Sequence, residues 1–434
     1  MPTPPENAVT NWAGNLRFRA ARQHRPTSLE ELQEIVAGAD RVHALGTGHS
    51  FTAVADTTGD HVCVAGLPGG VDVDHAVGTA TVTAGLRYGD AAHLLHGQGV
   101  ALHNLGSLPH ISVAGSVATG THGSGDGLGS LATAVRAVQM VTSGGEVVRL
   151  DRQRDADVWG GVVVALGALG VVTRIDLDVE PTYEVSQVVQ EHVPVDELLR
   201  ALDEVLAAAY SVSVFTDWRE PVQSQVWLKS RVDDQPSLPP RDWLGGRRAR
   251  RQVHMLAGRP PDSCTPQLGR PGPWHHRLPH FRLAFTPSSG EELQSEWFVP
   301  RQVGGDAVRA AAVVLRDLTA VVQTTEIRSV AADELWLSPA YGRASLALHV
   351  TWVRDVAAVL PAVERVEAAL APFAPRPHWA KLSRMSPDTV AARYPRLDDF
   401  AGLARRLDPR GAFRNDLLDS YVAREPATRP AFTS

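Results

Sequence analysis

Two glycine-rich loops near the N-terminus restrict the fold of this chain more than any other feature. The first, GTGHSF at 46–51, follows a strand-like run of apolar residues. Because glycine has no Cβ, successive amide groups in such a loop can point into one concavity and hold an anion such as a pyrophosphate. His49 lies at the edge of this loop, where its imidazole is a nucleophile beside the bound group. Alone, the pattern also fits a tight turn that carries a surface histidine.

The second loop spans residues 104–125 and lacks Asp, Glu, Lys and Arg. Glycine recurs in it, at positions 106, 115, 120, 123 and 125. A long loop with many backbone donors and few bulky side chains suits a large polar ligand. Neither loop has Gly-x-Gly-x-x-Gly after a strand or Gly-Lys-Ser/Thr, which disfavours a Rossmann site and an ATP-type phosphate loop. Together the loops predict a long dinucleotide cofactor that is held at two places.

Length and composition predict a large protein of two domains. With 434 residues the chain exceeds the size that one hydrophobic core usually supports. Its formal net charge of -6 argues against a nucleic-acid partner. The cysteines Cys63 and Cys264 provide neither a disulfide framework nor a metal motif. No apolar run resembles a signal peptide or a membrane span, so we expect a cytoplasmic protein without membrane contact.

Local patterns predict a mixture of helices and strands. Ser28 and Glu31 form a capping box before the apolar stripe of a helix at 29–38. Runs at 138–142 and 146–150, separated by Ser-Gly-Gly, predict a hairpin. Other expected strands include 15–19, 283–285, 323–330 and 344–353, and other expected helices include 195–208, 306–319 and 356–371. The proline- and arginine-rich passage from about 235 to 280 has weak periodicity, so we expect a surface excursion or an interface there.

Polar residues in the C-terminal half have the chemistry of an active site. Lys381 is one of only two lysines beside 40 arginines, which favours a place that needs a compact ammonium rather than a planar guanidinium. Glu326 and Arg328 are two apart in an expected strand, so their side chains share a face. His349 and Thr351 repeat this spacing in the next strand. The simpler alternatives are a surface lysine and an exposed ion pair on a sheet.

The histidines at 275, 276 and 280 do not predict a metal site. His276 and His280 are four apart, but Pro279 interrupts any helix that would align them. No nearby carboxylate or cysteine completes a ligand set. We therefore expect no bound metal, and the absence of Gly-x-Ser-x-Gly also disfavours a hydrolase.

The order and spacing of several motifs resemble the flavoproteins of vanillyl-alcohol oxidase type, and among them the alditol (xylitol) oxidases. The motifs are TNWAGN at 10–15, GTGHSF at 46–51, SLPHISVAGSVATGTHGSG at 107–125, LGALGVVT at 166–173, EIR at 326–328, HVTWV at 349–353, PHWAK at 377–381 and DPRGAFRN at 408–415. The resemblance implies an α+β fold, in which a two-subdomain FAD-binding domain of this PCMH type carries an α+β cap domain. It places the N-terminal part of the FAD-binding domain at 1–180, the substrate or cap domain at 181–373, and a C-terminal segment that returns to the first domain at 374–434.

The resemblance also implies that FAD is attached covalently through His49. The other implied cofactor contacts come from the two loops, from LGALGVVT and from PHWAK: Gly46, Thr47, Gly48, Ser50, Ser107, Ser112, Gly115, Thr119, Gly120, Thr121, His122, Val172 and His378. The implied substrate-binding residues are Ser107, Glu326, Arg328, His349, Thr351 and Lys381. Of these, three are implied catalytic groups: Lys381 stabilises a developing alkoxide, Arg328 holds the reacting oxygen, and Glu326 binds hydroxyls or acts as a base.

These residues predict oxidation of the terminal primary alcohol of a polyol such as xylitol or sorbitol to the aldose. Hydride would pass to flavin N5 and O2 would become H2O2. Hydrogen-bonding groups without an apolar slot suit an extended polyol better than an aromatic alcohol. An aldonolactone-type oxidoreductase of the same fold with a non-oxygen electron acceptor is the alternative, and a non-catalytic flavin-binding sensor or carrier is a third. We expect a monomer whose partners are the polyol and O2.

Overall fold

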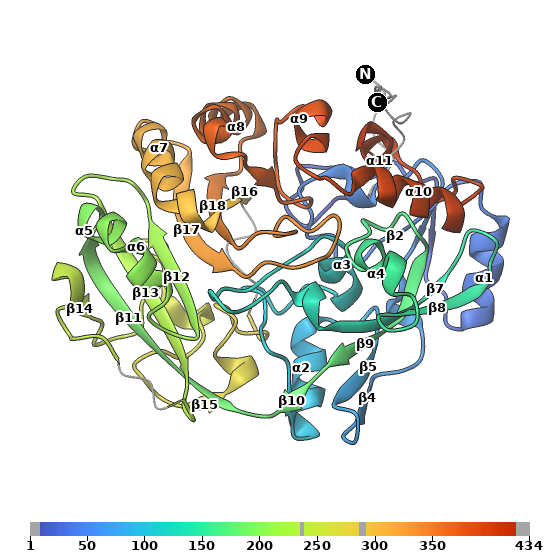
Figure 1. Ribbon diagram of the computed structural model, residues 1–434, viewed down its shortest axis with the longest axis horizontal. Coiled ribbons are helices and arrows are strands. Elements are labelled where there is room, and N and C mark those ends of the chain that lie inside the picture. The colour runs from blue at the N-terminus through green and yellow to red at the C-terminus, as the bar shows by residue number, and fades with distance from the viewer. Residues whose placement is uncertain (1–8, 235–237, 286–291, 422–434) are drawn as a thin grey trace, which may run out of the picture.

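The computed structural model describes residues 9–234, 238–285 and 292–421. Within these ranges the chain is an α+β protein with two sheet-containing parts that face each other (Figure 1). The proline- and arginine-rich passage expected at 235–280 is described from residue 238 onward. Residues 1–8 of the expected FAD-binding segment 1–180 and residues 422–434 of the expected C-terminal segment 374–434 lie outside the described residues. Among the described helices, none is both long and apolar enough to cross a membrane.

Small sheets and short helices build the N-terminal part. A parallel sheet has the order β1 (Arg22–His24), β3 (Asp60–Val62), β2 (Val42–Ala44). An antiparallel sheet has the order β4 (Val71–Asp74), β5 (Thr79–Thr83), β9 (Val171–Asp178), β7 (Val135–Val141), β8 (Val147–Asp151), and β6 (Val100–Ala101) pairs with β10 (Glu180–Pro181). Apolar residues of four helices pack with these sheets: α1 (Leu29–Gly38), α2 (Tyr88–Gly97), α3 (Val113–Ala118) and α4 (Ala156–Val162).

A nine-stranded sheet builds the second part. Its order is β14 (Arg247–Arg248), β11 (Glu184–Pro194), β13 (Gln223–Arg231), β12 (Ser211–Thr216), β17 (Val322–Val330), β18 (Ser345–Val353), β16 (Glu292–Pro300), β19 (Arg376–Pro377), and β15 (Gly272–Pro273) pairs with β11. All neighbouring strands in it are antiparallel. Its helices are α5 (Val195–Arg200), α6 (Leu202–Leu206), α7 (Gly304–Arg316) and α8 (Val356–Leu370).

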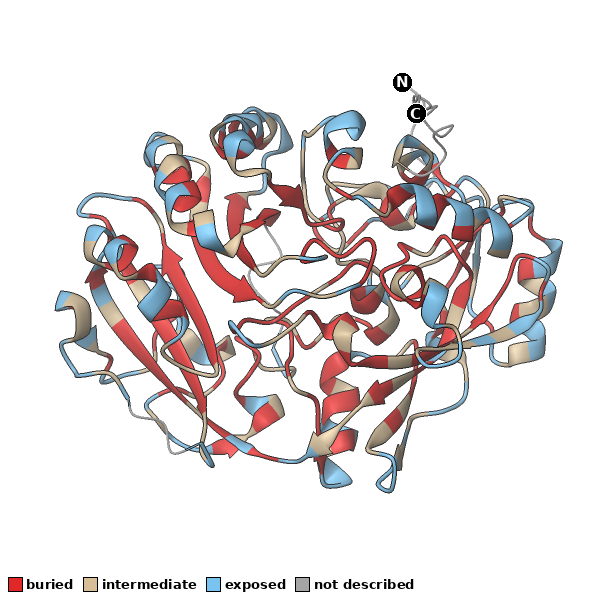
Figure 2. Ribbon diagram, viewed as in Figure 1, coloured by how far each residue is buried: buried red, intermediate tan, exposed pale blue. Residues whose placement is uncertain are grey.

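The nine-stranded sheet is buried on both faces, as Figure 2 shows for most of its strands. On the outer face, Ile327 and Val350 form one apolar core with residues of the four helices. On the inner face of β17, Glu326 and Arg328 are also buried. Because a sheet that buries polar groups must cover them with another layer, this inner face lies against the N-terminal part.

Two local predictions are confirmed. The helix expected at 29–38 is α1, and the Ser28 hydroxyl accepts a hydrogen bond from the amide of Glu31 at its start. The Glu31 carboxylate accepts from the amide of Thr27, one residue before the expected position. The hairpin expected at 138–150 is the antiparallel pair of β7 and β8.

Three local predictions are wrong. Residues 15–19 form no strand: the amide of Leu16 donates to the Asn11 side chain, and Arg17 makes only an isolated bridge with Thr10. Residues 283–285 are a turn and a bend. The helix expected at 195–208 is divided at Ala201 into α5 and α6.

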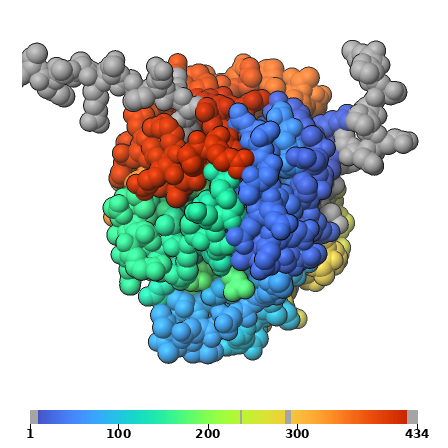
Figure 3. Space-filling view, turned by 90° about the vertical axis from the view of Figure 1, so that its right-hand side faces the viewer, coloured from blue at the N-terminus to red at the C-terminus, as the bar shows by residue number. Residues whose placement is uncertain are grey.

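The C-terminal segment returns to the N-terminal part of the chain. Figure 3 shows the two side by side. This segment contains α9 (Pro387–Ala391), α10 (Leu397–Leu407) and α11 (Asp416–Tyr421). The amide of Val42 in β2 donates to the carbonyl of Ala412 over 2.8 Å. The Arg410 guanidinium donates to carbonyls of Ala37, Ala39 and Ser143. Residues distant in sequence therefore complete the sheet that precedes the first glycine loop.

Candidate active site

A cavity of about 610 Å³ lies between the inner face of the nine-stranded sheet and the N-terminal part. Its volume is in the range of small-molecule and cofactor sites. Both glycine-rich loops, residues 166–172 and the ends of β17 and β18 contribute to its wall. The two halves of the sequence thus meet around one space.

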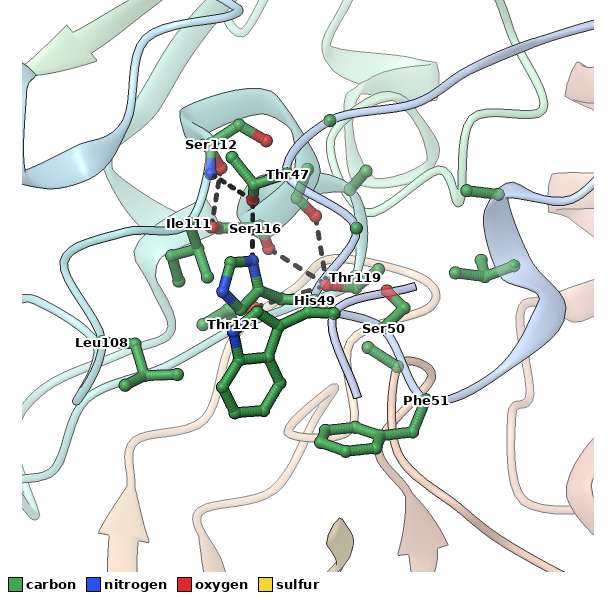
Figure 4. Close-up of a pocket in the computed structure, with 18 of the residues that line it drawn as sticks. Thr47, His49, Ser50, Phe51, Leu108, Ile111, Ser112, Ser116, Thr119 and Thr121 are labelled. Atoms are coloured by element: carbon green, nitrogen blue, oxygen red, sulfur yellow. Dashed lines mark hydrogen bonds between the residues drawn. The ribbon is translucent and has the colours of Figure 1, made fainter. Parts of the chain in front are cut away.

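The two glycine-rich loops touch each other at one end of this cavity (Figure 4). The amide of Ser112 donates to the Thr47 hydroxyl over 3.3 Å. A Cβ on Gly46 would lie 2.3 Å from the Ser112 hydroxyl oxygen, so this contact needs glycine. Gly48 adopts a φ of +69°, which also favours glycine. The two loops therefore lie together and form one glycine-rich cradle at the cavity.

His49 stands in this cradle as a neutral imidazole. Its ring stacks on Trp12 with 5.3 Å between ring centroids, and its Nδ1 lies 3.0 Å from the Thr47 hydroxyl oxygen. Burial lowers the pKa of His49 to about 4, and the nearby charges of His110 and Lys381 act in the same direction. Its Nε2 is buried without a hydrogen-bond partner among the described residues. A buried nitrogen of this kind fits a site that is completed by a bound group.

The residues present fit FAD. Amides of the cradle can hold a pyrophosphate, and the cavity continues past His49 to the polar face of the sheet. The implied cofactor residues that line the cavity are Gly46, Thr47, Gly48, His49, Ser50, Ser107, Ser112, Gly115, Thr119, Thr121, His122, Val172 and His378. Gly120 is not part of the lining. It has a φ of +70°, and a Cβ there would meet Pro339 at 3.3 Å, so the turn and this packing account for the glycine.

The inner face of β17 and β18 presents the implied substrate groups to the cavity. Glu326 lies directly opposite His349, and Thr324 lies opposite Thr351. All four side chains are buried and line the cavity. The two-residue period of a strand places them on one face, as the sequence predicts.

Arg328 links two carboxylates on this face. Its Nη2 donates to Glu296 Oε1 over 2.5 Å, its Nε lies 3.6 Å from Glu326 Oε1, and its Nη1 donates to the Ser107 hydroxyl over 3.4 Å. Burial is the largest single influence and acts to raise the pKa values of Glu296 and Glu326, but Arg328 and the neighbouring histidines together outweigh it and hold both below their ordinary range. Both carboxyl groups are therefore ionised at neutral pH.

Lys381 reaches the same cavity from the PHWAK segment. Its Nζ donates to Gln294 Oε1 and lies 5.0 Å from the centre of the Phe51 ring. Burial lowers its pKa to about 8, against the opposing effect of Glu296. His378, three residues before it, is buried and accepts a hydrogen bond from the amide of Ala380 through Nδ1. Burial lowers the pKa of His378 to about 3, so its ring is neutral.

Sequence reasoning missed two sets of cavity residues. The first is on β16, where Glu292, Gln294 and Glu296 line the cavity. They alternate in the sequence with Leu293 and Trp297, a period-two signal that indicates a polar inner face. The second comes from the passage expected to be a surface excursion or an interface, four residues of which line the cavity: His254, Met255, Leu256 and His280.

The cavity also has an apolar wall, contrary to the expectation that no apolar slot is present. Its side chains come from both parts of the chain: Phe51, Leu108, Phe215, Met255, Leu256 and Phe281. The proline- and arginine-rich passage, described at 238–280, is called the inserted passage below. The apolar residues around Phe215 form a separate core cluster under it. His280 does not join His275 and His276, whose rings pack together, but lies 2.8 Å from Glu326.

Comparisons with known proteins match the chain over nearly its whole length. A family model described as FAD binding domain matches residues 21–151, and one described as D-arabinono-1,4-lactone oxidase matches residues 288–421. Over 421 residues the chain is 51% identical to the alditol oxidase of a Streptomyces species, with 95% of this chain and 99% of that protein covered.

More distant relatives act on lactones according to their names. The chain is 30% identical to the L-gulono-1,4-lactone dehydrogenase of Mycobacterium tuberculosis, over 94% of this chain and 97% of the relative. It is 25% identical to the L-gulonolactone oxidase of Bos taurus, also over 94% and 97%. The matched FAD-binding region contains the cradle, and the higher identity is to alditol oxidase. The chain therefore belongs to the FAD-dependent flavoprotein family of vanillyl-alcohol oxidase type, near the alditol oxidases.

Proposed function

We propose that this protein is an FAD-dependent oxidase that converts the terminal primary alcohol of a polyol, such as xylitol or sorbitol, to the aldose and reduces O2 to H2O2. The observation that carries the proposal is that the buried polar residues Glu326, Arg328, His349 and Thr351, with the partly buried Lys381, meet the glycine cradle in one cavity. The 51% identity to an alditol oxidase supports the substrate class. Five hydrogen-bonding side chains along two strands and a loop match the repeated hydroxyls of a polyol.

The side chains divide the work of alcohol oxidation. FAD, when bound, supplies the hydride acceptor at N5 and passes the electrons to O2. The alcohol proton needs an acceptor, and the ionised Glu326 carboxylate can receive it through a hydrogen bond to the hydroxyl. Arg328 and Lys381 present cationic donors to the reacting oxygen as negative charge develops on it. His349, Thr351 and Ser107 orient the remaining hydroxyls.

We propose that His49 carries the cofactor covalently. Its imidazole is neutral at pH 7, and its buried Nε2 has no partner within the described residues. Attachment to an imidazole withdraws electrons from a flavin and favours hydride uptake from an unactivated alcohol. Acid-precipitated parent protein should stay yellow, and acid-precipitated His49→Ala should be colourless. A yellow His49→Ala precipitate would contradict the attachment.

The lactone reaction with a non-oxygen acceptor is the second candidate, because the C-terminal family match carries a lactone description and a relative of 30% identity is named a lactone dehydrogenase. Peroxide release with xylitol or sorbitol and O2 tests the main proposal. Turnover of an aldonolactone with a dye, without peroxide from polyols, would support the alternative. Anaerobic polyol that leaves the bound flavin yellow would instead favour a sensor or carrier.

The proposal also includes a cytoplasmic monomer with the domain division 1–180, 181–373 and 374–434. Both cysteines are free within the described chain, which agrees with a reducing compartment. The net charge of -6 supports the absence of a nucleic-acid partner. Fractionation of the source cells tests the location, and light scattering tests the oligomeric state.

A further inference from the structure

The mechanism above does not use the second lysine of the chain, although it is more deeply buried than the first. Lys229 lies in the middle of β13 with 1% of its surface exposed. A buried ammonium is costly unless acceptors replace its hydration. Burial lowers the pKa of Lys229 to about 7. The presence of a buried lysine, in a chain with 40 arginines and only two lysines, needs an explanation from its surroundings.

Three acceptors converge on this ammonium. Its Nζ donates to the carbonyl of Leu278, to the carbonyl of Pro279 over 3.3 Å, and to Nδ1 of His280 over 3.0 Å. Because an ammonium has three N–H groups, these contacts satisfy it fully. A planar guanidinium would direct its donors differently and would not match this arrangement.

The same imidazole bonds the site carboxylate. His280 Nε2 lies 2.8 Å from Glu326 Oε1, with the Ser213 hydroxyl 3.3 Å away as a second neighbour. An ionised carboxylate only accepts hydrogen bonds, so Nε2 must carry the hydrogen. The charged groups that face this ring are Lys229 from β13 and Glu326 and Arg328 from β17. Together they favour a neutral ring that accepts at Nδ1 and donates at Nε2.

The backbone and two aromatic rings fix the position of this imidazole. Phe215 and Trp227 each contact the His280 ring edge to face, with 5.4 Å between ring centroids. The amide of His280 donates to the carbonyl of Ser107 over 3.1 Å, which ties the inserted passage to the second glycine loop. The ring therefore has little freedom to turn away from Glu326.

We propose that Lys229 is a positioning residue, whose ammonium locks His280 as the Nε2–H tautomer so that His280 holds Glu326 in place as a hydrogen-bond acceptor for the substrate hydroxyl. This inference rests on the proposed role of Glu326. The contacts run from Lys229 on β13 through His280 in the inserted passage to Glu326 on β17. Neither lysine is then interchangeable with arginine, although only Lys381 lines the cavity.

A neutron crystal structure of the unmutated protein at about pH 5.5, below the Lys229 pKa of about 7 and above the His280 pKa of about 4, tests the tautomer directly. We expect deuterium on His280 Nε2, none on Nδ1, and three deuterons on Lys229 Nζ. Deuterium on Nδ1, or an amine with two deuterons, would overturn the proposal. This readout needs no polyol and no variant, so it stands even where the proposed function fails.

Lys229→Met tests the consequence in solution. Removal of the ammonium takes away a positive neighbour of His280, so the histidine should titrate at a higher pH than the value of about 4 that burial and Lys229 impose. The His280 Cε1–H signal, identified by its loss in His280→Gln, should begin its acid titration at a higher pH in Lys229→Met than in the parent, when both are followed below about pH 6, where Lys229 keeps its proton. An unchanged titration in a folded Lys229→Met would contradict the proposal.

Kinetics of the flavin-loaded protein complete the test. Lys229→Met should lower kcat/KM for a polyol by about 10- to 100-fold, the usual effect of a misplaced supporting group. Ser211 lies directly opposite Lys229 in the sheet, and Ser211→Ala is the matched control that disturbs the same buried layer without contacting His280. Equal losses in Lys229→Met and Ser211→Ala would mean that packing, rather than His280, explains the effect.

Discussion

Arg328 bonds Glu296 although the strands that carry them are not neighbours. β17 and β16 flank β18, on which Ala347 lies directly opposite Arg328 and His349 lies directly opposite Glu296, so the ion pair crosses β18 diagonally. The small side chain of Ala347 leaves room for the contact. This ion pair therefore joins the two strands that supply most of the buried charge in the cavity.

Glu296→Gln should impair turnover more than folding. The substitution removes one of two carboxylates that orient Arg328, and we expect kcat/KM for a polyol to fall by about 10- to 100-fold. Anaerobic stopped-flow measurement of flavin bleaching reports this loss. Glu367, a buried carboxylate on the outer side that accepts from Trp297, provides the matched control, Glu367→Gln. Equal bleaching rates in Glu296→Gln and the parent would refute the role of the pair.

Gly46→Ala should block the cradle by a steric contact that a second substitution relieves. The added methyl would lie 2.3 Å from the Ser112 hydroxyl oxygen but 3.5 Å from its Cβ. We expect FAD binding to weaken by about tenfold, as for other overpacked sites, and Gly46→Ala/Ser112→Ala to recover much of it. Absorbance of the purified proteins measures flavin content.

Gly106→Ala is the control for this pair of variants. A Cβ on Gly106 would have its nearest contact at 3.5 Å, with Thr121, which is an ordinary distance. Flavin content should therefore match that of the parent. A double variant as poor in flavin as Gly46→Ala would show that the Ser112 hydroxyl is not the obstacle.

Polyol oxidation should decline above pH 8 because Lys381 loses its proton. Burial lowers the pKa of Lys381 to about 8, so the ammonium is present below that pH and disappears as the pH rises through it. The profile of kcat/KM, which reports the free enzyme, should show this alkaline limb. Lys381→Met should cost about 10²- to 10³-fold in kcat and lack the limb. A flat parent profile to pH 10 would exclude the ammonium as the required form.

Acid should destabilise the protein partly through His43. This side chain is buried, and burial lowers its pKa from 6.5 to about 4. Between these pH values the unfolded chain binds the proton and the folded chain does not, so stability rises with pH from 4 to 6.5 and is lost in the reverse direction. We expect roughly 3 kcal/mol of this dependence to disappear in His43→Leu. Urea unfolding midpoints measured across that pH range provide the check.

Local patterns predict much of the fold because their physical causes lie within a few residues. The capping contact of Ser28 and the apolar stripe behind it place α1 correctly. The period of two in β17 and β18 correctly places Glu326 and His349 on a shared face. Glycine loops without charged residues correctly indicate where a cavity forms, because their close approach depends on missing side chains.

Long-range contacts account for what the sequence did not predict. His280 reaches the site because its amide bonds Ser107, far away in sequence, and nothing in the residues around Pro279 indicates that partner. Trp12 stacks on His49 only because its amide donates to the carbonyl of Gly48. Local periodicity carries no information about such pairings. Of the cavity residues that were not expected from the sequence, those on β16 have a period-two pattern from which they could have been predicted.

The hydrogen bond between Val42 and Ala412 makes the first glycine loop depend on residues far along the chain. β2 precedes that loop, and Ala412 and Phe413 belong to the same buried cluster as Val42. Without these partners, β2 would expose apolar side chains and the loop would lose its support. A truncation just before residue 412 should therefore disturb the N-terminal loop, although it removes none of the described residues that line the cavity.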